Sequence, residues 1–360
     1  MQQIVITGAT GFVGSALAAN LLSRNTKVIA LSRNDPDGAR TVAAIAAAAQ
    51  GFGFDVSGAV CRHLNVINVE FGRLEKDLEC ADLSGVTDVW HVAAEMSSSP
   101  HKLSQAFNAN VGNTVRLYEA MQRQATTCRR FYYVSTAYVA GMAGGPVPEE
   151  LHAASHMVNA YQITKWSAEQ ALHLLYRRHR LPVTVFRPSV VVGHRQTGWA
   201  HRNGFGFYMF LEGMMAIAKA GLSELAVGVV PDTRTDLVSI DQLVMDACLL
   251  TERKDSGQDF EVFHCGGGLL VRASELVKIL GEAVGLQSRL GAPVTALEQR
   301  FEGAVEPNMP FAENEWAFDR SKLDAATNRT TPAPLSVEDL RKLCRWYVAV
   351  SASELSVAVS

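Results

Sequence analysis

The sequence predicts an α/β protein built on a doubly wound parallel sheet, with a smaller mixed region toward the C-terminus. Short apolar runs alternate with helical patterns from the first residues up to about residue 187. The first run, 3–6, is followed at once by a turn with three glycines. After Pro188 the alternation is lost, and glycine, aromatic and methionine residues dominate 194–235.

Strands are predicted from short apolar runs, and helices from apolar residues three and four positions apart. The predicted strands span 3–6, 27–31, 59–64, 86–92, 130–135 and 181–187. The predicted helices span 15–23, 42–50, 103–124 and 160–179, and 236–250 is predicted as a strand with a returning helix. Because helices separate consecutive strands, the strands should pair in parallel, with helices covering both faces of the sheet.

Composition excludes several classes of protein. The 33 basic and 36 acidic residues give a net charge of −3, without the basic excess that a nucleic-acid partner requires. The six cysteines share no C-x-x-C spacing, so we expect reduced thiols and no metal site. The longest apolar run, 42–49, is too short to cross a membrane, and a strand so close to Met1 leaves no room for a secretion signal. We therefore expect a cytoplasmic protein without a membrane span.

Gly8, Gly11 and Gly14 form the turn between the first strand and the first helix. A pyrophosphate binds on the exposed N–H groups of a helix N-terminus, and the backbone approaches it only where no Cβ intervenes. Gly8 should permit the tight turn, Gly11 the approach to the phosphates, and Gly14 the packing of helix on sheet. This context predicts a Rossmann-type dinucleotide-binding fold. The same turn should place three further residues at the cofactor: Thr10, Phe12 and Val13.

Ser32 and Arg33 follow the second strand, where the adenosine ribose of a dinucleotide is bound. An acidic residue there would bind the ribose diol and repel a 2′-phosphate, whereas a hydroxyl and a guanidinium suit the phosphate. The sequence therefore favours NADP(H) over NAD(H), although Asp35 and Asp37 follow closely enough to serve a ribose instead. Asn65-Val66, after the strand predicted at 59–64, is the expected adenine contact.

The chain of 360 residues is long enough for one large domain or two modest ones. We expect a dinucleotide-binding Rossmann domain at 1–190, to which 236–265 returns. Residues 191–235 and 266–350 should form a smaller substrate-binding region, and 351–360 a frayed tail.

Tyr161 and Lys165 form a Y-x-x-x-K pattern in the helix predicted at 160–179, so both side chains lie on one face. A tyrosine hydroxyl has a pKa of about 10, and a nearby ammonium lowers that pKa by favouring the phenolate. The segment 133–138, YVSTAY, ends a predicted strand and offers Ser or Thr hydroxyls to a reacting carbonyl oxygen. Tyr161 would deliver the proton to that oxygen.

Five motifs, in order along the chain, resemble those of an extended short-chain dehydrogenase/reductase. They are TGATGFVG at 7–14, HVAA at 91–94, YVSTAYVAG at 133–141, YQITK at 161–165 and RPS at 187–189. Within that superfamily, KWSAE at 165–169 and RPSVVVGHRQTG at 187–198 are most similar to the fatty acyl-CoA reductase and thioester reductase group.

The resemblance implies a Thr-Tyr-Lys active site, with Thr136 as the hydroxyl member and Tyr161 as acid and base. Lys165 would hold the nicotinamide ribose and tune the tyrosine. Thr136 stands where many members have serine, which keeps the hydroxyl and can change the width of the pocket. The resemblance also implies further residues at the cofactor, namely Ala93, Ala94, Asn110, Pro188, Ser189, Val190 and Val191.

The same resemblance implies an NADPH-dependent oxidoreductase that reduces an acyl thioester, bound to coenzyme A or to a carrier, to an aldehyde or alcohol. One alternative is another extended enzyme, either a nucleotide-sugar epimerase/dehydratase or a ketone/alcohol dehydrogenase. A second alternative is a non-catalytic NADP-binding regulator. Such regulators typically lose the Tyr/Lys pair that this chain keeps, and sugar-nucleotide enzymes favour an acidic residue where Ser32-Arg33 stands.

Several features allow two interpretations each. The aromatic and methionine residues between Trp199 and Met215 either line an apolar slot or form a core. His91 is expected to be a packing residue rather than a catalyst. The helices at 103–124 and 160–179 either pair across a homodimer face or belong to a monomer. A cluster of basic residues is either a solvated loop or a site for phosphates of coenzyme A or phosphopantetheine: His194, Arg195, His201 and Arg202.

Overall fold

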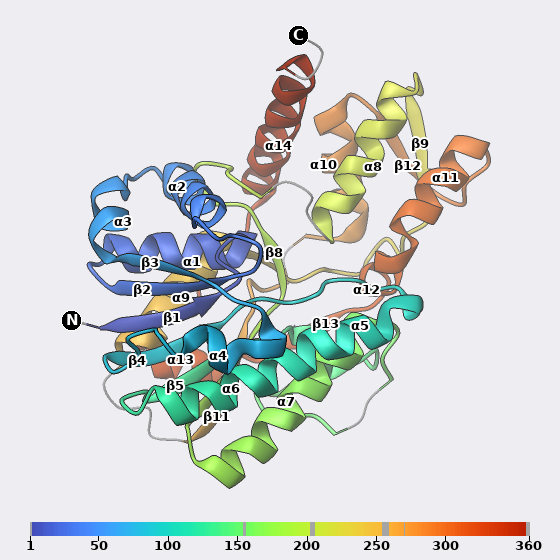
Figure 1. The fold of residues 1–360 in the computed structure, drawn as a ribbon. Coiled ribbons are helices and arrows are strands. Elements are labelled where there is room, and N and C mark those ends of the chain that lie inside the picture. The colour runs from blue at the N-terminus through green and yellow to red at the C-terminus, as the bar shows by residue number, and fades with distance from the viewer. Residues whose placement is uncertain (1, 154–155, 202–205, 254–258, 270, 358–360) are drawn as a thin grey trace.

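The computed structural model describes residues 2–153, 156–201, 206–253, 259–269 and 271–357. Within these residues, seven strands form one parallel sheet in the order β11-β7-β5-β4-β1-β2-β3 (Figure 1). The chain winds one way from β1 to β3 and the other way from β4 to β11, so the predicted doubly wound α/β fold is confirmed. Ligands of such sheets bind where the strand order reverses, which here is between β1 and β4.

The strands of this sheet are β1 (Gln3–Thr7), β2 (Lys27–Ser32), β3 (Leu64–Asn68), β4 (Val86–His91), β5 (Arg130–Val134), β7 (Val183–Pro188) and β11 (Phe260–Cys265). Short parallel pairs are β8 (Val190–Val192) with β10 (Leu237–Ser239), β9 (Glu224–Val227) with β12 (Gln287–Leu290), and β6 (Gly145–Val147) with β13 (Trp316–Phe318).

The helices are α1 (Phe12–Ser23), α2 (Ala39–Phe52), α3 (Ser57–His63), α4 (Leu74–Leu78), α5 (Leu103–Phe107), α6 (Asn113–Gln124), α7 (Ala160–His179), α8 (Phe207–Lys219), α9 (Ile240–Glu252), α10 (Ala273–Val284), α11 (Ala296–Val305), α12 (Met309–Ala312), α13 (Ser321–Thr327) and α14 (Val337–Val357). Single turns are η1 (Phe71–Arg73), η2 (Pro100–Lys102), η3 (Asn108–Gly112), η4 (Ala137–Ala140) and η5 (Glu306–Asn308).

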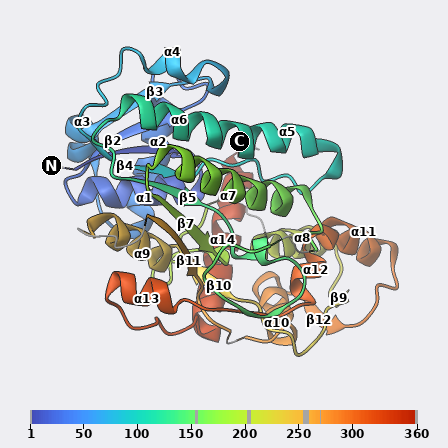
Figure 2. The same ribbon diagram turned by 90° about the horizontal axis from the view of Figure 1, so that it is seen from below.

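Side chains alternate along each strand, so the sheet buries a separate core on each face. In β1, Ile4 and Ile6 belong to the core that α1, α2 and α9 cover. Val5 between them belongs to the core that α4, α6 and α7 cover. Figure 2 shows α6 and α7 side by side on their face of the sheet. This two-sided burial explains why the strands read as continuous apolar runs.

Two predicted elements differ in the structure. The strand predicted at 59–64 is wrong, because α3 occupies Ser57–His63 and β3 begins at Leu64. Val56, Val60 and Leu64 lie four residues apart and pack toward one core, which is a helical spacing. The helix predicted at 103–124 is helical throughout but contains a π turn, η3, between α5 and α6.

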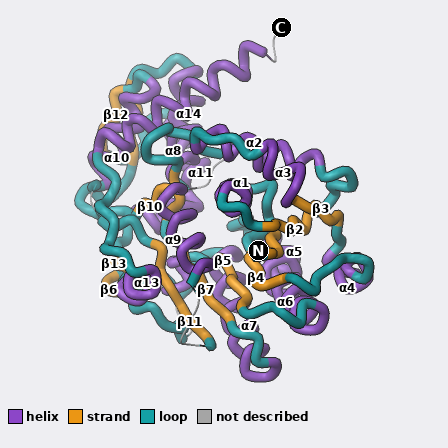
Figure 3. Tube along the Cα trace, turned by 90° about the vertical axis from the view of Figure 1, so that its left-hand side faces the viewer, coloured by secondary structure: helices purple, strands orange, loops and turns teal. Residues whose placement is uncertain are grey.

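The chain after β7 contributes to the sheet and to a second layer. β11 pairs with β7, whereas α8, α10, α11 and α14 gather in a lobe at one end of the molecule (Figures 1 and 3). Leu211, Leu280 and Leu343 share the core of this lobe. Residues 351–357, within the segment predicted as a frayed tail, continue α14. In the described part of the chain, no helix combines the length and the apolar character needed to cross a membrane.

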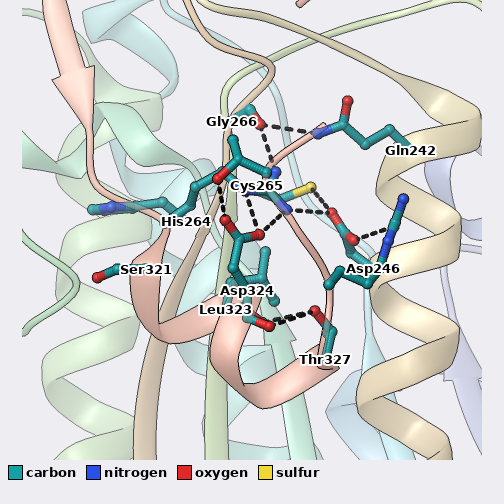
Figure 4. A network of polar contacts seen from close by, with 12 residues as sticks. Gln242, Asp246, His264, Cys265, Gly266, Ser321, Leu323, Asp324 and Thr327 are labelled. Atoms are coloured by element: carbon teal, nitrogen blue, oxygen red, sulfur yellow. Dashed lines mark hydrogen bonds and ion pairs between the residues drawn. The ribbon is translucent and has the colours of Figure 1, made fainter. Parts of the chain in front are cut away.

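A buried polar network joins α9, β11 and α13 (Figure 4). The carboxylate of Asp246 in α9 accepts hydrogen bonds from Arg320 at 3.3 Å and from Arg329 at 2.7 Å. The carbonyl oxygen of Gly266, just after β11, accepts from Gln242 at 3.0 Å and from Arg320 at 2.7 Å. Segments from the last quarter of the chain are therefore fastened to the edge of the sheet.

Candidate active site

A cavity of about 790 Å³ opens at the carboxyl ends of β1, β4, β5 and β7, where the strand order reverses. Most residues predicted at the site line it: Gly8, Thr10, Gly11, Phe12, Val13, Gly14, Ser32, Arg33, Ala93, Ala94, Thr136, Tyr161, Lys165, Pro188, Ser189, Val190 and Val191. Three predicted residues, Asn65, Val66 and Asn110, are not among the lining residues. The structure thus brings the glycine turn, the tyrosine, the lysine and the threonine to one space.

The glycine turn leaves the N-terminus of α1 open to this cavity. Gly8 has a φ of +77°, and a Cβ there would lie 2.7 Å from the backbone nitrogen of Ala93. A Cβ at Gly14 would lie 2.1 Å from the carbonyl oxygen of Gly8, so α1 packs on the turn itself. Gly11 caps α1 with no side-chain hydrogen bond. The backbone N–H groups of the first helical turn are therefore placed to bind a phosphate, as a dinucleotide requires.

In the segment after β2, two arginine side chains line the cavity, whereas the first carboxylate, that of Asp35, is buried away from it. Arg33 and Arg40 are exposed and line the cavity. Asp35 is buried, and its carboxylate accepts from the backbone nitrogens of Arg40 and Thr41 and from the Thr41 hydroxyl at 2.6 Å. Burial alone would raise the pKa of Asp35, but these hydrogen bonds outweigh it and lower the pKa. Asp35 therefore fixes the start of α2 and does not face the cavity.

Asn65 and Val66, where an adenine contact was expected, do not line the cavity. Both residues are inside β3, because the strand starts later than the sequence pattern indicated. Asn68 ends the strand, and its side chain accepts a hydrogen bond from the backbone nitrogen of Asp35. Phe71, three residues further, lines the cavity.

Tyr161 and Lys165 lie in the first turns of α7. Asn159 caps this helix by accepting a hydrogen bond from the backbone nitrogen of Gln162 at 2.8 Å. The Lys165 ammonium donates to the carbonyl oxygen of Val134 at 2.6 Å and lies 5.9 Å from the centre of the Tyr161 ring. Burial lowers the pKa of Lys165 to about 7 and raises the pKa of Tyr161. The tyrosine is therefore a neutral phenol at physiological pH, the form that can donate a proton.

Thr136 and Ser135 follow the end of β5 and both line the cavity. The Thr136 hydroxyl accepts from the backbone nitrogen of Tyr138 at 3.3 Å, so its own proton is free to point elsewhere. The Ser135 hydroxyl is buried and has no hydrogen-bond partner among the described residues. Two hydroxyls are thus available beside Tyr161 to bind an oxygen atom of a substrate or cofactor.

Asn110 does not line the cavity, but its side chain connects two segments that surround the cavity. Its side-chain oxygen accepts from the backbone nitrogen of Glu95 at 2.7 Å. Its side-chain nitrogen donates to the carbonyl oxygen of Glu95 and to the Thr164 hydroxyl, both at 2.9 Å. Asn110 is therefore a positioning residue that ties the loop after β4 to α7, one residue before Lys165.

His91 at the end of β4 is a packing residue, as expected. Its ring nitrogens contact the hydroxyls of Thr7 at 2.7 Å and Thr114 at 3.0 Å. Burial lowers the pKa of His91 to about 3, so the ring is neutral at physiological pH. The Thr7 hydroxyl also accepts from the backbone nitrogens of Val92 and Ala93, which fixes the chain where it passes Gly8.

A buried ion pair joins α7 to β7. Arg187 and Glu169 form two parallel hydrogen bonds, at 2.9 Å and 2.6 Å, and neither side chain is exposed. The guanidinium also contacts the carbonyl oxygen of Glu150 and the ring of His264 in β11. Both partners belong to motifs that carried the resemblance, and the structure gives them a structural role.

The region between Trp199 and Met215 divides between cavity and core. Phe207, Tyr208, Met209 and Phe210, at the start of α8, line the cavity. Met214 is fully buried in the core of the lobe. Trp199 packs on Phe12 at 5.3 Å between ring centres and fills space that Gly51 leaves open. Both interpretations of this stretch therefore hold, for different residues.

The basic cluster at 194–202 is dispersed in the structure. The His194 ring accepts from the backbone nitrogens of Gln196 and Thr197 and packs on Phe52. Arg195 donates to the carbonyl oxygen of Ala333. His201 lines the cavity, and Arg202 lies outside the described residues.

Several lining residues carried no recognisable signal in the sequence. Gln162 is buried and donates to the carbonyl oxygen of Tyr138 at 2.9 Å, which links α7 to the turn after β5. Others come from loops after the strands and from the lobe: Arg40, Phe71, Met96, Ser98, Leu276 and Phe311. The only sequence signal for Gln162 was that it directly follows Tyr161. In the described ranges, no group of three or more His, Cys, Asp or Glu side chains is placed to hold a metal ion.

Comparison with known proteins places this site in context. The family model described as male sterility protein matches residues 6–245. An isonitrile lipopeptide synthase of Streptomyces coeruleorubidus is 25% identical over 233 residues, which are 64% of this chain and 15% of that protein. The hybrid PKS-NRPS synthetase poxE of Penicillium oxalicum is 29% identical over 201 residues, which are 53% of this chain and 4% of that protein. The chain thus spans a small part of these two relatives.

A relative of similar length is a dTDP-6-deoxy-L-talose 4-dehydrogenase (NAD(P)(+)) of Kitasatospora kifunensis, 25% identical over 293 residues, or 80% of this chain and 81% of that protein. Among solved structures, the terminal R domain from the myxalamid PKS-NRPS biosynthetic pathway has a TM-score of 0.75 at 20% identity, covering 98% of this chain and 91% of that chain. UDP-glucuronic acid 4-epimerase from Bacillus cereus, in complex with NAD, has a TM-score of 0.67 at 19% identity, covering 95% and 94%. These two structures share the fold.

Proposed function

Because the chain belongs to the male sterility protein family, and is thus an NAD(P)-dependent enzyme of the extended short-chain dehydrogenase/reductase type, we propose that it reduces an acyl thioester with NADPH. The product is an aldehyde, or an alcohol after a second reduction. The acyl group is carried on the thiol of coenzyme A or of a carrier-bound phosphopantetheine. Among the relatives, the peptide and polyketide synthetases favour a carrier-bound substrate.

One observation carries the proposal: the catalytic side chains open into a cavity that is also lined by apolar side chains of the lobe. Tyr161 and Thr136 line one part of it, and Leu276 and Phe311 line another. A thioester needs this combination, because its carbonyl oxygen must meet proton donors while its acyl chain must be buried away from water.

The arrangement of these residues supports the following reaction. Bound NADPH supplies a hydride to the carbonyl carbon of the thioester. The Thr136 hydroxyl donates a hydrogen bond to the carbonyl oxygen, and Tyr161 gives that oxygen its proton as negative charge develops. When it is protonated, Lys165 places a positive charge near the phenol as the proton leaves. The resulting hemithioacetal loses its thiol to give the aldehyde, so thioester, NADPH and a proton yield aldehyde, thiol and NADP+.

The residues after β2 support NADPH as the reductant. Arg33 and Arg40 bring two guanidinium groups to the cavity, which suits a 2′-phosphate. The carboxylate of Asp35, the first acidic residue after β2, accepts hydrogen bonds from the backbone nitrogen and the hydroxyl of Thr41 at the start of α2, so it is not free to bind a ribose diol. Gly8, Gly11 and Gly14 would hold the pyrophosphate, and Lys165 the nicotinamide ribose.

We expect Arg33→Asp to weaken NADPH binding by about 10- to 100-fold, because a charge-assisted hydrogen bond to phosphate is replaced by repulsion. NADH binding should change little, since NADH has no 2′-phosphate. Both affinities can be measured by fluorescence titration. Arg178→Asp, an exposed arginine of α7 away from the cavity, is the matched control. Equal losses for NADPH and NADH would contradict the role given to Arg33.

The substrate class is tested by NADPH oxidation with acyl-CoA and acyl-pantetheine thioesters, aldehydes, ketones and nucleotide sugars assayed side by side. We expect thioesters to be reduced, with release of a thiol that a chromogenic disulfide detects. The second candidate is a nucleotide-sugar dehydrogenase, because the relative of similar length acts on such a substrate by its name. Turnover of a nucleotide sugar without any thioester would establish that alternative.

A further inference from the structure

The cavity extends past the catalytic side chains to α10, where one stripe of the helix forms its wall. Residues three and four positions apart on a helix share a face, and four such residues line the cavity. We call them the α10 stripe: Ala273, Leu276, Val277 and Leu280. Their exposed fractions are only 3% to 9%, whereas Met209 of α8 and Phe311 of α12, which also line the cavity, are half-buried. The α10 stripe is therefore a buried part of the cavity wall.

The side chains of the α10 stripe contain no hydrogen-bonding atoms. From α8 onward the polar lining residues are Tyr208, Thr235 and Asn308. The Tyr208 hydroxyl accepts a hydrogen bond from the backbone nitrogen of Gly193, and the Asn308 amide is directed at the sulfur of Met209. A sugar or a nucleotide placed against the stripe would bury hydroxyl or amide groups without partners, which costs free energy. Methylene groups need no partners and gain free energy when they leave water.

α10 also presents a second buried face that does not line the cavity. Ile279 is 1% exposed and belongs to the core of the lobe, yet it is absent from the cavity wall. The helix packs against α8, α14 and β12. Leu276, Val277 and Leu280 belong to the same core as Ile279, but unlike Ile279 they also line the cavity.

We infer that the α10 stripe is the floor of an acyl-chain slot and sets the length of chain that the enzyme accepts. This inference rests on the proposed reduction of an acyl thioester. Each methylene that the slot buries raises kcat/KM by about fourfold, and the rise stops when the chain end reaches the stripe. Ala273 leaves room for the end of the chain, and Leu280 closes it off.

Two variants should change the depth of the slot in opposite directions. Leu280→Ala deepens the slot and should raise kcat/KM for the next longer chains by about fourfold per added methylene. Ala273→Leu fills the slot and should shift the optimum to shorter chains. Ile279→Ala removes a similar volume from the other buried face of α10 and should leave the chain-length profile unchanged. NADPH affinity, measured by titration, should stay constant in all three.

The experiment measures kcat/KM for acyl-pantetheine thioesters from butyryl to palmitoyl, and the Kd of the matching S-alkyl pantetheine thioethers, which have no carbonyl to reduce. Opposite shifts in Leu280→Ala and Ala273→Leu, in either measurement, support the inference. An unchanged length profile in both folded variants, or an equal shift in Ile279→Ala, overturns it. If one variant fails to fold, the other still decides.

The two proposals fail in different ways. In one outcome, thioether binding depends on chain length and changes in the stripe variants, but no thioester is turned over. This outcome contradicts the proposed reaction and supports the slot. Thioester reduction with a length profile that ignores the stripe keeps the reaction and removes the slot. Thioethers that bind with no dependence on length in the wild-type enzyme also overturn the slot.

Discussion

Tyr161→Phe is expected to lower kcat by about 10²- to 10⁴-fold, the usual range for loss of a general acid, while NADPH still binds. The substitution removes the hydroxyl that donates the proton and keeps the ring that lies near Lys165. Burial raises the pKa of Tyr161, so the wild-type residue holds its proton until the substrate oxygen accepts it. Steady-state rates and cofactor titration measure the two effects separately.

The control for this prediction is Tyr176→Phe in the same helix. The Tyr176 hydroxyl donates to Asp259 at 2.8 Å and does not line the cavity, so its loss should leave kcat nearly unchanged. Thr136→Ser should also be mild, because it retains a hydroxyl. A loss smaller than tenfold in Tyr161→Phe would show that another group supplies the proton.

Glu169→Gln is expected to lower the free energy of unfolding by about 3–5 kcal/mol, because it leaves the buried Arg187 charge without a counter-charge. Both side chains are fully buried, and no water can replace the lost carboxylate. Urea denaturation at neutral pH, followed by circular dichroism, measures the change. Glu252→Gln, which breaks the exposed pair with Arg24, should cost no more than about 1 kcal/mol. A Glu169→Gln protein as stable as the wild type would show that the pair does not hold α7 on β7.

The sequence predicted those parts of the fold that depend on local order. Strand, glycine turn and helix at 3–23 are contiguous, so Gly8 and Gly14 could be placed without tertiary information. The Y-x-x-x-K spacing likewise fixes Tyr161 and Lys165 on one face of one helix. Short apolar runs were less reliable, because Val56, Val60 and Leu64 fit a helix as well as a strand.

The remaining site residues depend on contacts between distant segments. Asn110 acts through Glu95 and Thr164, and no spacing along the chain records that contact. Arg40 reaches the cavity only because α2 starts where Asp35 caps it. The α10 stripe has the pattern of any amphipathic helix, and only the fold shows that this face of the helix also lines a cavity.

The return of β11 to the sheet determines how this chain can be divided. β7 lies between β5 and β11, and the ring of His264 in β11 contacts Arg187 in β7. A truncation at residue 245, the end of the family match, would strip β7 of that neighbour and expose an open sheet edge prone to aggregation. The lobe cannot be excised either, since its helices come from both sides of β11. Sheet and lobe are therefore interleaved along the chain, and hybrid enzymes should exchange side chains lining the slot instead of whole segments.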